Sequence, residues 1–200
     1  DFPSSNAIDA NGNIFVTGYS YGSSSDPDYC TIKYNNSGAQ QWVQRYGGPD
    51  GWDESWNIIL DPAGNVYITG NSAGVGTGDD YCTIKYNNSG VQQWIARYTG
   101  PDSSNDYCNW VAPDANGNVY VTGYTASPSS QDFITIKYNS QGVQQWANLQ
   151  NGVGNTADAG YAVFVDNSSN IYVTGALENK LAVIKYNSSG VQQWIQRYAA

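Results

Sequence analysis

The strongest constraint on the fold of this chain is a segment that occurs four times in succession. Each copy contains a β-branched residue followed by Thr and Gly, and these glycines lie 52, 53 and 52 residues apart, at Gly18, Gly70, Gly123 and Gly175. Each copy also ends in a strand-like segment with one tryptophan at the same place, namely Trp42, Trp94, Trp146 and Trp194. A period near 50 residues with strand-like content is typical of the blades of a β-propeller.

The second copy shows how one unit is expected to fold. Strands are predicted at 55–61, 65–70, 81–87 and 91–98, with a glycine-rich loop over 71–80. Side chains alternate in character along 81–87, which is typical of a strand. The turn from Asn87 to Gly90 has the Asn and Gly residues of a tight hairpin. Because short connections pair consecutive strands antiparallel, each unit is predicted to form a four-stranded meander.

The four units are predicted to make one repeat domain over residues 1–200, with blades at about 1–48, 49–100, 101–152 and 153–200. Both faces of each predicted sheet carry apolar or aromatic groups. Trp94 and Ile95, for example, lie on opposite faces of the same strand. A sheet that is apolar on both faces must be covered on both, so the units are expected to stack face to face. The predicted fold class is therefore all-β, a β-propeller built of four-stranded antiparallel blades.

Two sequence patterns in each copy carry a resemblance to a known family. The first, D-x-x-G-N-[IV]-[FY]-[VI]-T-G, is represented in the first copy by Asp9, Gly12, Asn13, Thr17 and Gly18. The second, D-[YF]-x-x-x-K-Y-N-x-x-G-x-x-x-W, is represented by Asp28, Lys33, Tyr34, Asn35, Gly38 and Trp42. Together they resemble the bacterial β-propeller repeats of the SBBP type and, more distantly, the NHL repeat. The resemblance implies that strand one lies nearest the central axis, that strand four lies on the rim, and that six or seven blades are usual.

The last copy departs from these patterns. Ser169 stands where the other turns have glycine, and Glu178-Asn179-Lys180 replaces the acidic residues before the third strand. If the function depends on equivalent loops, this unit is expected to contribute differently.

Four units leave three arrangements open. The chain closes as a four-bladed propeller, it is an excerpt of a longer propeller, or its two outer blade faces pair with other copies in a ring or a filament.

The charge balance excludes two classes of partner. The chain has 8 Lys and Arg against 17 Asp and Glu, a net charge of -9. Nucleic acids and anionic membranes are bound by clustered cations, so no nucleic-acid partner is expected. No apolar run approaches the roughly 20 residues of a membrane-spanning helix, so no membrane insertion is predicted. The chain has no Met and begins at Asp1, which we interpret as a processed or internal start, and the predicted location is extracellular or cell surface.

No catalytic residues are predicted, and the chain is not expected to be an enzyme. It contains no His, the commonest general base, and none of the usual nucleophile or phosphate-binding motifs. The adjacent carboxylates Asp53 and Glu54, or Asp79 and Asp80, are not the opposed pair that glycoside hydrolysis requires. The cysteines Cys30, Cys82 and Cys108 are predicted to be buried free thiols, with a Cys82–Cys108 disulfide as the alternative.

Carboxylates before the third strand of the first three units are candidate binding residues on one rim, with Trp52 in a link between units. They are Asp26, Asp28, Asp79, Asp80 and Asp132. They could bind Ca²⁺ or a basic partner, although a capping or blade-linking role is favoured. Aspartates that begin equivalent turns are expected to cap the backbone and not to bind Ca²⁺; they are Asp9, Asp61, Asp114 and Asp166. No metal site and no cofactor are therefore predicted, with Ca²⁺ as the alternative.

Other repeated residues are expected to be structural. The cations Lys33, Lys85, Lys137 and Lys185, and Arg45, Arg97 and Arg197, are predicted to pair with Asp or to lie over aromatic rings. The four repeated tryptophans are predicted to pack blade against blade, in preference to a sugar-stacking platform. N-glycosylation sequons occur at Asn35, Asn87, Asn167 and Asn187, and they matter only in a host that modifies secreted proteins.

The predicted function is a non-enzymatic extracellular binding or structural module that presents rim loops to a protein or carbohydrate partner. One alternative is a structural subunit that self-associates through its end blades. Another is a Ca²⁺-dependent carbohydrate-binding or carbohydrate-active propeller.

Overall fold

The computed structural model describes residues 1–200 except 23–25, 128–129, 155 and 199–200. Within these described residues, sixteen strands form four sheets. The first sheet contains β1 (Phe2–Ile8), β2 (Ile14–Ser20), β3 (Asp28–Tyr34) and β4 (Gln40–Tyr46). The second contains β5 (Asp53–Leu60), β6 (Val66–Gly74), β7 (Gly78–Tyr86) and β8 (Gln92–Tyr98). The third contains β9 (Asp106–Pro113), β10 (Val119–Ala126), β11 (Gln131–Tyr138) and β12 (Gln144–Gln150). The fourth contains β13 (Ala159–Val165), β14 (Ile171–Leu177), β15 (Lys180–Tyr186) and β16 (Gln192–Tyr198).

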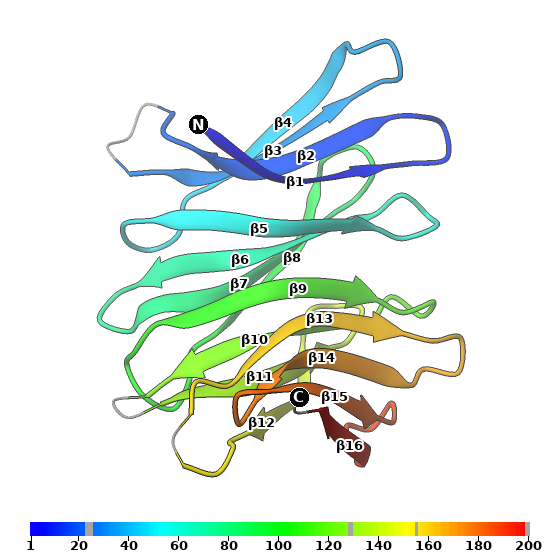
Figure 1. Cartoon of the computed structure of the whole chain (residues 1–200). Helices are drawn as coiled ribbons and strands as arrows, with labels where there is room; N and C mark the ends of the chain where they lie inside the picture. The colour runs from blue at the N-terminus through cyan, green and yellow to red at the C-terminus, as the bar shows by residue number, and fades with distance from the viewer. Residues whose placement is uncertain (23–25, 128–129, 155, 199–200) are drawn as a thin grey trace.

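Each sheet is a simple meander in which every strand pairs antiparallel with its neighbours in sequence, as in the order β5-β6-β7-β8. The four sheets, hereafter blades one to four, are stacked in chain order (Figure 1). Their first strands pack against one another, β1 on β5, β5 on β9 and β9 on β13. The described residues form no helix, and hence none that could cross a membrane. The predicted all-β blade architecture is confirmed.

The blades do not close into a ring. Blade one and blade four lie at opposite ends of the stack (Figure 1), and their outer faces are exposed at Val43 and Leu181. The closed four-bladed arrangement is therefore wrong for this chain. The four blades therefore form an open stack (Figure 1).

The hairpin between the second and third strands of blade two is longer than predicted. The segment 71–80, expected to be a loop, belongs mostly to β6 and β7, and their pairing continues to Gly74 opposite Gly78. The polar residues that suggested a loop are buried against blade three and the blade edge. Asn71 Oδ1 accepts a hydrogen bond from the backbone N–H of Cys108 at 3.0 Å, and Ser72 accepts one from the Arg97 side chain.

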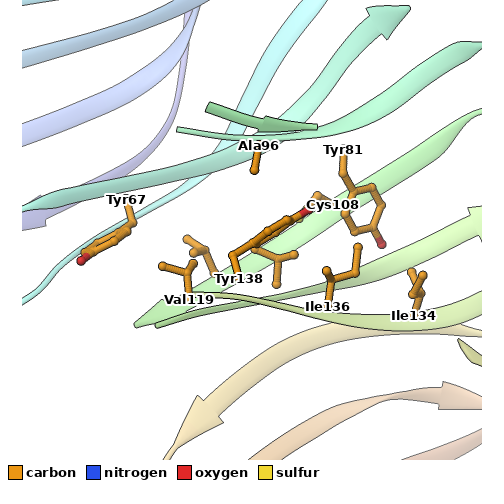
Figure 2. Close-up of a cluster of buried hydrophobic side chains, with 10 residues drawn as sticks. Tyr67, Tyr81, Ala96, Cys108, Val119, Ile134, Ile136 and Tyr138 are labelled. Atoms are coloured by element: carbon orange, nitrogen blue, oxygen red, sulfur yellow. The ribbon is translucent and has the colours of Figure 1, made fainter. Parts of the chain in front are cut away.

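The core consists of three apolar clusters, and each lies between two consecutive blades. The cluster between blades two and three is shown in Figure 2, where Tyr67 and Tyr81 come from blade two and Val119 and Ile136 from blade three. In the part of the chain that the structure describes, no apolar cluster lies within a single blade, so each blade depends on its neighbours for burial.

A bulge in every first strand explains the repeated glycine. The pairing register shifts between Ser55 and Asn57, and the bulge brings the Glu54 carbonyl into contact with Gly70. A Cβ at Gly70 would overlap that carbonyl and would lie 2.8 Å from the Tyr29 hydroxyl of blade one. Glycine is therefore needed where two backbones and a neighbouring ring meet.

Candidate functional site

Three of the four repeated tryptophans lie between blades, as predicted, and the fourth, Trp194, does not. Trp42 donates from Nε1 to the Asn88 carbonyl of blade two at 3.1 Å, and its ring centroid lies 6.3 Å from that of Tyr86. Its ring covers Gly90, whose Cβ position would be only 2.8 Å from the indole. Trp94 and Trp146 make the equivalent contacts with blades three and four. Trp194, on the last blade, has no following blade and is exposed.

The repeated lysines lie over aromatic rings of their own blades. Their ammonium groups are 5.0 to 5.4 Å from the ring centroids, for the pairs Lys33–Phe15, Lys85–Tyr67, Lys137–Tyr120 and Lys185–Tyr172. Two of them also reach the next blade, where Lys33 donates to the Asn88 carbonyl at 3.2 Å and Lys137 to the Ser188 carbonyl at 2.8 Å. The four ammonium groups lie on separate blades, each over a ring of its own blade.

The rim carboxylates are distributed over the first three blades, and several have partners in the fold. Asp80 is buried and pairs with Arg97 at 3.0 Å, and Asp28 lies 3.9 Å from Arg45. Asp79 accepts from the Tyr107 hydroxyl at 3.0 Å.

The remaining candidates differ in their surroundings. In blade three, Leu149 takes the place of the arginine, and the buried Asp132 accepts from Ser130 at 3.1 Å. Asp26 is partly buried ahead of β3. No group of three potential acidic or cysteine ligands is gathered among the described residues.

A second set of aspartates was not singled out from the sequence as a repeat. Asp53, Asp106 and Asp158 occupy the same place before or at the start of the first strand and are buried. Each accepts from a backbone N–H in the link that precedes it: Gly48 at 2.5 Å, Gly100 at 2.5 Å and Gly152 at 2.6 Å. Burial raises the pKa of Asp53 and of Asp106. Their regular spacing in the sequence is the signal that could have revealed them.

The turn aspartates use both carboxylate oxygens within the turn. Asp61 Oδ1 accepts from the N–H groups of Ala63 and Asn65, both at 2.9 Å. Its Oδ2 accepts from the Asn65 amide at 2.7 Å and the Tyr67 hydroxyl at 3.0 Å. The equivalent hydrogen bond from an asparagine side chain lowers the pKa of Asp166 in blade four. Little oxygen capacity remains for a cation.

The sequon asparagines are turn residues. Asn35 Oδ1 accepts from the N–H groups of Ser37 and Ala39, and Asn87 and Asn187 make the same pair of bonds. Asn139 does so too, although no sequon occurs there. Asn167 is exposed in a different turn. Hydrogen bonding in the turn therefore accounts for asparagine at the repeated position.

All three cysteines are unpaired. Cys82 lies in the cluster between blades one and two, whereas Cys108 lies in the cluster between blades two and three. Thr69 donates to Cys108 Sγ at 2.8 Å. Burial raises the pKa of both thiols to about 12. The alternative of a Cys82–Cys108 disulfide is wrong because the two thiols belong to different interfaces.

Exposed aromatic residues follow the stacked first strands. Trp56 on β5, Trp110 on β9 and Tyr161 on β13 are 43%, 39% and 58% exposed. Figure 1 shows β5, β9 and β13 one above another, and each is an edge strand of its sheet. Trp52, in the link before β5, lies 6.4 Å from Tyr19 between ring centroids and is also exposed. We call Trp56, Trp110 and Tyr161 the aromatic edge.

Comparison with protein families identifies the repeat. The SBBP β-propeller repeat matches residues 41–76 and 93–128. The chain therefore contains SBBP β-propeller repeats over these residues. Each match runs from the fourth strand of one blade to the end of the second strand in the next, so it spans a blade interface. No curated protein sequence matches the chain.

Solved structures that resemble this β-propeller repeat protein are longer than it is. A protein of unknown function from Bacteroides caccae has a TM-score of 0.61 at 11% identity, over 97% of this chain and 60% of its own. An ulvan lyase of family PL25 has a TM-score of 0.60 at 12% identity, over 98% and 56%. A gluconolactonase from Xanthomonas campestris has a TM-score of 0.53 at 12% identity, over 96% and 60%. The resemblance shows the fold alone, and this chain spans 56% to 60% of their lengths.

Proposed function

We propose that this β-propeller repeat protein is a non-enzymatic binding module of the cell exterior, and that it contacts its partner through the aromatic edge. The observation that carries the proposal is the exposure of Trp56, Trp110 and Tyr161 on three neighbouring strands of a packed scaffold. Most of the other large aromatic side chains of blades two and three are buried or lie between blades.

The physical reason is that exposed aromatic residues on rigid strands favour binding. A large apolar side chain in water gains free energy when a partner covers it, and it loses little conformational entropy if its backbone is already fixed. Tryptophan and tyrosine are accordingly enriched at the energetic centres of interfaces. Trp52 and the rim carboxylates lie outside this edge and are proposed as peripheral contacts.

Two observations favour binding over catalysis. The sequence contains no His. The carboxylates Asp53 and Asp106, which are the most deeply buried of blades two and three, are bonded to backbone groups of the links. Aromatic faces also suit the apolar faces of sugar rings, so carbohydrate polymers are tested beside proteins.

The experiment compares the wild-type chain with the double variant Trp56→Ala/Trp110→Ala. Co-sedimentation with insoluble cellulose and chitin, and capture on immobilised casein and gelatin, supply the partners. We expect the wild type to bind at least one of these materials and the double variant to bind it at least tenfold more weakly.

The matched control is Val75→Ala, which removes an exposed apolar side chain away from the aromatic edge and should leave binding unchanged. Equal binding by the double variant, or no binding by the wild type to any of the four materials, would refute the proposal. Adding Ca²⁺ or a chelator is expected to change neither binding nor Tm.

A further inference from the structure

The two ends of the stack expose the two halves of an interface that the structure contains three times. We call the side of a blade that faces the following blade its leading face, and the side that faces the preceding blade its trailing face. At the three internal interfaces both faces are covered, and together they form the apolar clusters. The trailing face of blade one and the leading face of blade four have no neighbour among the described residues (Figure 1).

The trailing face of blade one contains a hollow of ≈ 460 Å³, lined in part by Val16, Gly18, Cys30, Ile32 and Val43. On blade two, Ile68 and Ile84 take the places of Val16 and Ile32 and are fully buried by blade one. On blade one, which has no preceding blade to cover it, Val43 is 44% exposed. The hollow therefore has the residue types of a covered interface.

A ring from the preceding blade fills the corresponding place inside the stack. The Tyr29 hydroxyl lies 2.8 Å from the Cβ position of Gly70, and the Tyr81 hydroxyl lies 2.5 Å from that of Gly123. At Gly18 no such ring is present. On the last blade Leu181 takes the place of Tyr29 and Tyr81, and it is 62% exposed.

The two residues of the tryptophan–glycine contact are also both unpartnered at the ends of the stack, the glycine on blade one and the tryptophan on blade four. Inside the stack each tryptophan covers a turn glycine of the next blade, as Trp146 covers Gly190 at 2.8 Å from its Cβ position. Gly38 is the equivalent turn glycine of blade one, and no atom lies within 4 Å of its Cβ position. Trp194, on the leading face of blade four, is 39% exposed and covers no such glycine.

The arginine and tyrosine that form a hydrogen bond between blades also have equivalents at the two ends of the stack. At the first interface Arg97 donates to the Tyr46 hydroxyl of the preceding blade at 3.3 Å. The equivalent residues at the free ends are Arg45 on blade one and the exposed Tyr198 on blade four.

We propose that the leading face of blade four docks on the trailing face of blade one of a second copy, in the register of the internal interfaces. Trp194 then covers Gly38, Leu181 enters the hollow at Gly18, and Tyr198 meets Arg45. The contact is heterologous, because each copy offers one face of each kind, so it can repeat from copy to copy. This inference does not depend on the proposed binding role of the aromatic edge.

The test separates the two faces by substitution. Leu181→Arg blocks only the leading face, and Val43→Arg blocks only the trailing face. Sedimentation velocity over a range of concentrations should show the wild type above its monomer mass of 21.7 kDa and each variant at that mass. An equimolar mixture should form a heterodimer of twice that mass, because one intact face of each kind remains. The dissociation constant of wild-type association should rise at least tenfold in each variant alone.

Val75→Arg is the matched control, since Val75 is an exposed valine on a hairpin tip away from both faces, and it should assemble like the wild type. Circular dichroism checks folding. If either variant unfolds, Trp194→Glu replaces it on the leading face and Ile14→Glu on the trailing face, where Ile14 lies two residues before Val16 on β2. A wild type that stays at 21.7 kDa at every concentration, or a mixture that stays monomeric while the wild type assembles, would overturn the proposal.

Discussion

A single residue in each first turn shows how backbone conformation constrains the repeat. Gly12, Gly64 and Gly117 adopt φ of +77°, +79° and +76° there, and Ser169 adopts a φ of 58° at the equivalent place in blade four. A side chain in this left-handed region is strained by its Cβ, whereas glycine is not. Ser169 keeps the turn hydrogen bond to the Asp166 carbonyl at 2.9 Å, so the turn is preserved at a cost in free energy.

Replacing this serine should therefore stabilise the protein. Ser169→Gly is expected to raise the free energy of unfolding by about 1 kcal/mol, after allowance for the greater freedom of glycine in the unfolded chain. Urea unfolding followed by tryptophan fluorescence measures the change. The reciprocal variant Gly117→Ser should lower it by a similar amount, and a stabilising Gly117→Ser would contradict the explanation.

Two aspartates should respond to pH in opposite directions. Burial raises the pKa of Asp106, so the wild type loses stability from this group as the pH rises through the ordinary value of 3.8 towards the higher folded value. Hydrogen bonding from Asn170 lowers the pKa of Asp166, so its contribution is present above 3.8 and is lost as the pH falls towards the lower folded value.

Unfolding free energies of the two asparagine variants across this range provide the measurement. The destabilisation caused by Asp106→Asn should be larger below 3.8 than above it, and that caused by Asp166→Asn should be larger above it. The same trend with pH in both variants would show that burial does not govern Asp106.

At the scale of strands, the fourth strand of each of the first three blades packs against the following blade. Trp94 on β8 contacts Tyr67 of its own blade and Tyr138 of blade three. Its Nε1 donates to the Ser140 carbonyl at 3.0 Å. Trp194 on β16 has the intrablade contact with Tyr172 but no following blade. Trp94 is therefore expected to contribute more to the free energy of unfolding than Trp194.

Truncating the two tryptophans should reveal this difference. Trp94→Ala is expected to cost about 3 to 5 kcal/mol, as for a large side chain removed from a packed core. Trp194→Ala should cost about 1 kcal/mol in dilute monomer, since it is near the surface. Thermal and urea unfolding measure both, and equal losses would argue against packing between blades as the source.

The strands and their stacking followed from the repeat, because strand alternation and apolar residues on both faces depend on local sequence. The assignment of Trp94 to packing rested on the same regularity. The extension of β6 through Asn71 and Ser72 could not be predicted, because these polar residues are satisfied by Cys108 and Arg97 from other strands. The buried role of Asp106 was missed since its partner, the Gly100 N–H, lies in a link whose path the sequence does not determine.

The whole molecule is a stack whose members each bury their faces against neighbours. Blades two and three have a neighbour on both sides, whereas blades one and four have one only. Stability in such an array is a sum of blade and interface contributions, so the ends open more easily than the middle.

Hydrogen exchange of the monomer should show this gradient. Backbone amides of β6, β7, β10 and β11 are expected to exchange slowest, and those of β2, β3, β14 and β15 faster, although all are central strands of their sheets. Mass spectrometry of peptic fragments resolves the four blades. Uniform protection across them would mean that the chain unfolds only as a whole.

The meander topology also bears on how the chain acquires its structure. Every strand pairs with a strand adjacent in sequence, and each of blades two to four packs on the blade that precedes it in the chain. No pairing has to wait for a distant segment, so the contact order is low for an all-β protein and refolding should be fast for this class. During synthesis, each of blades two to four can therefore pack on a preceding blade that has already left the ribosome.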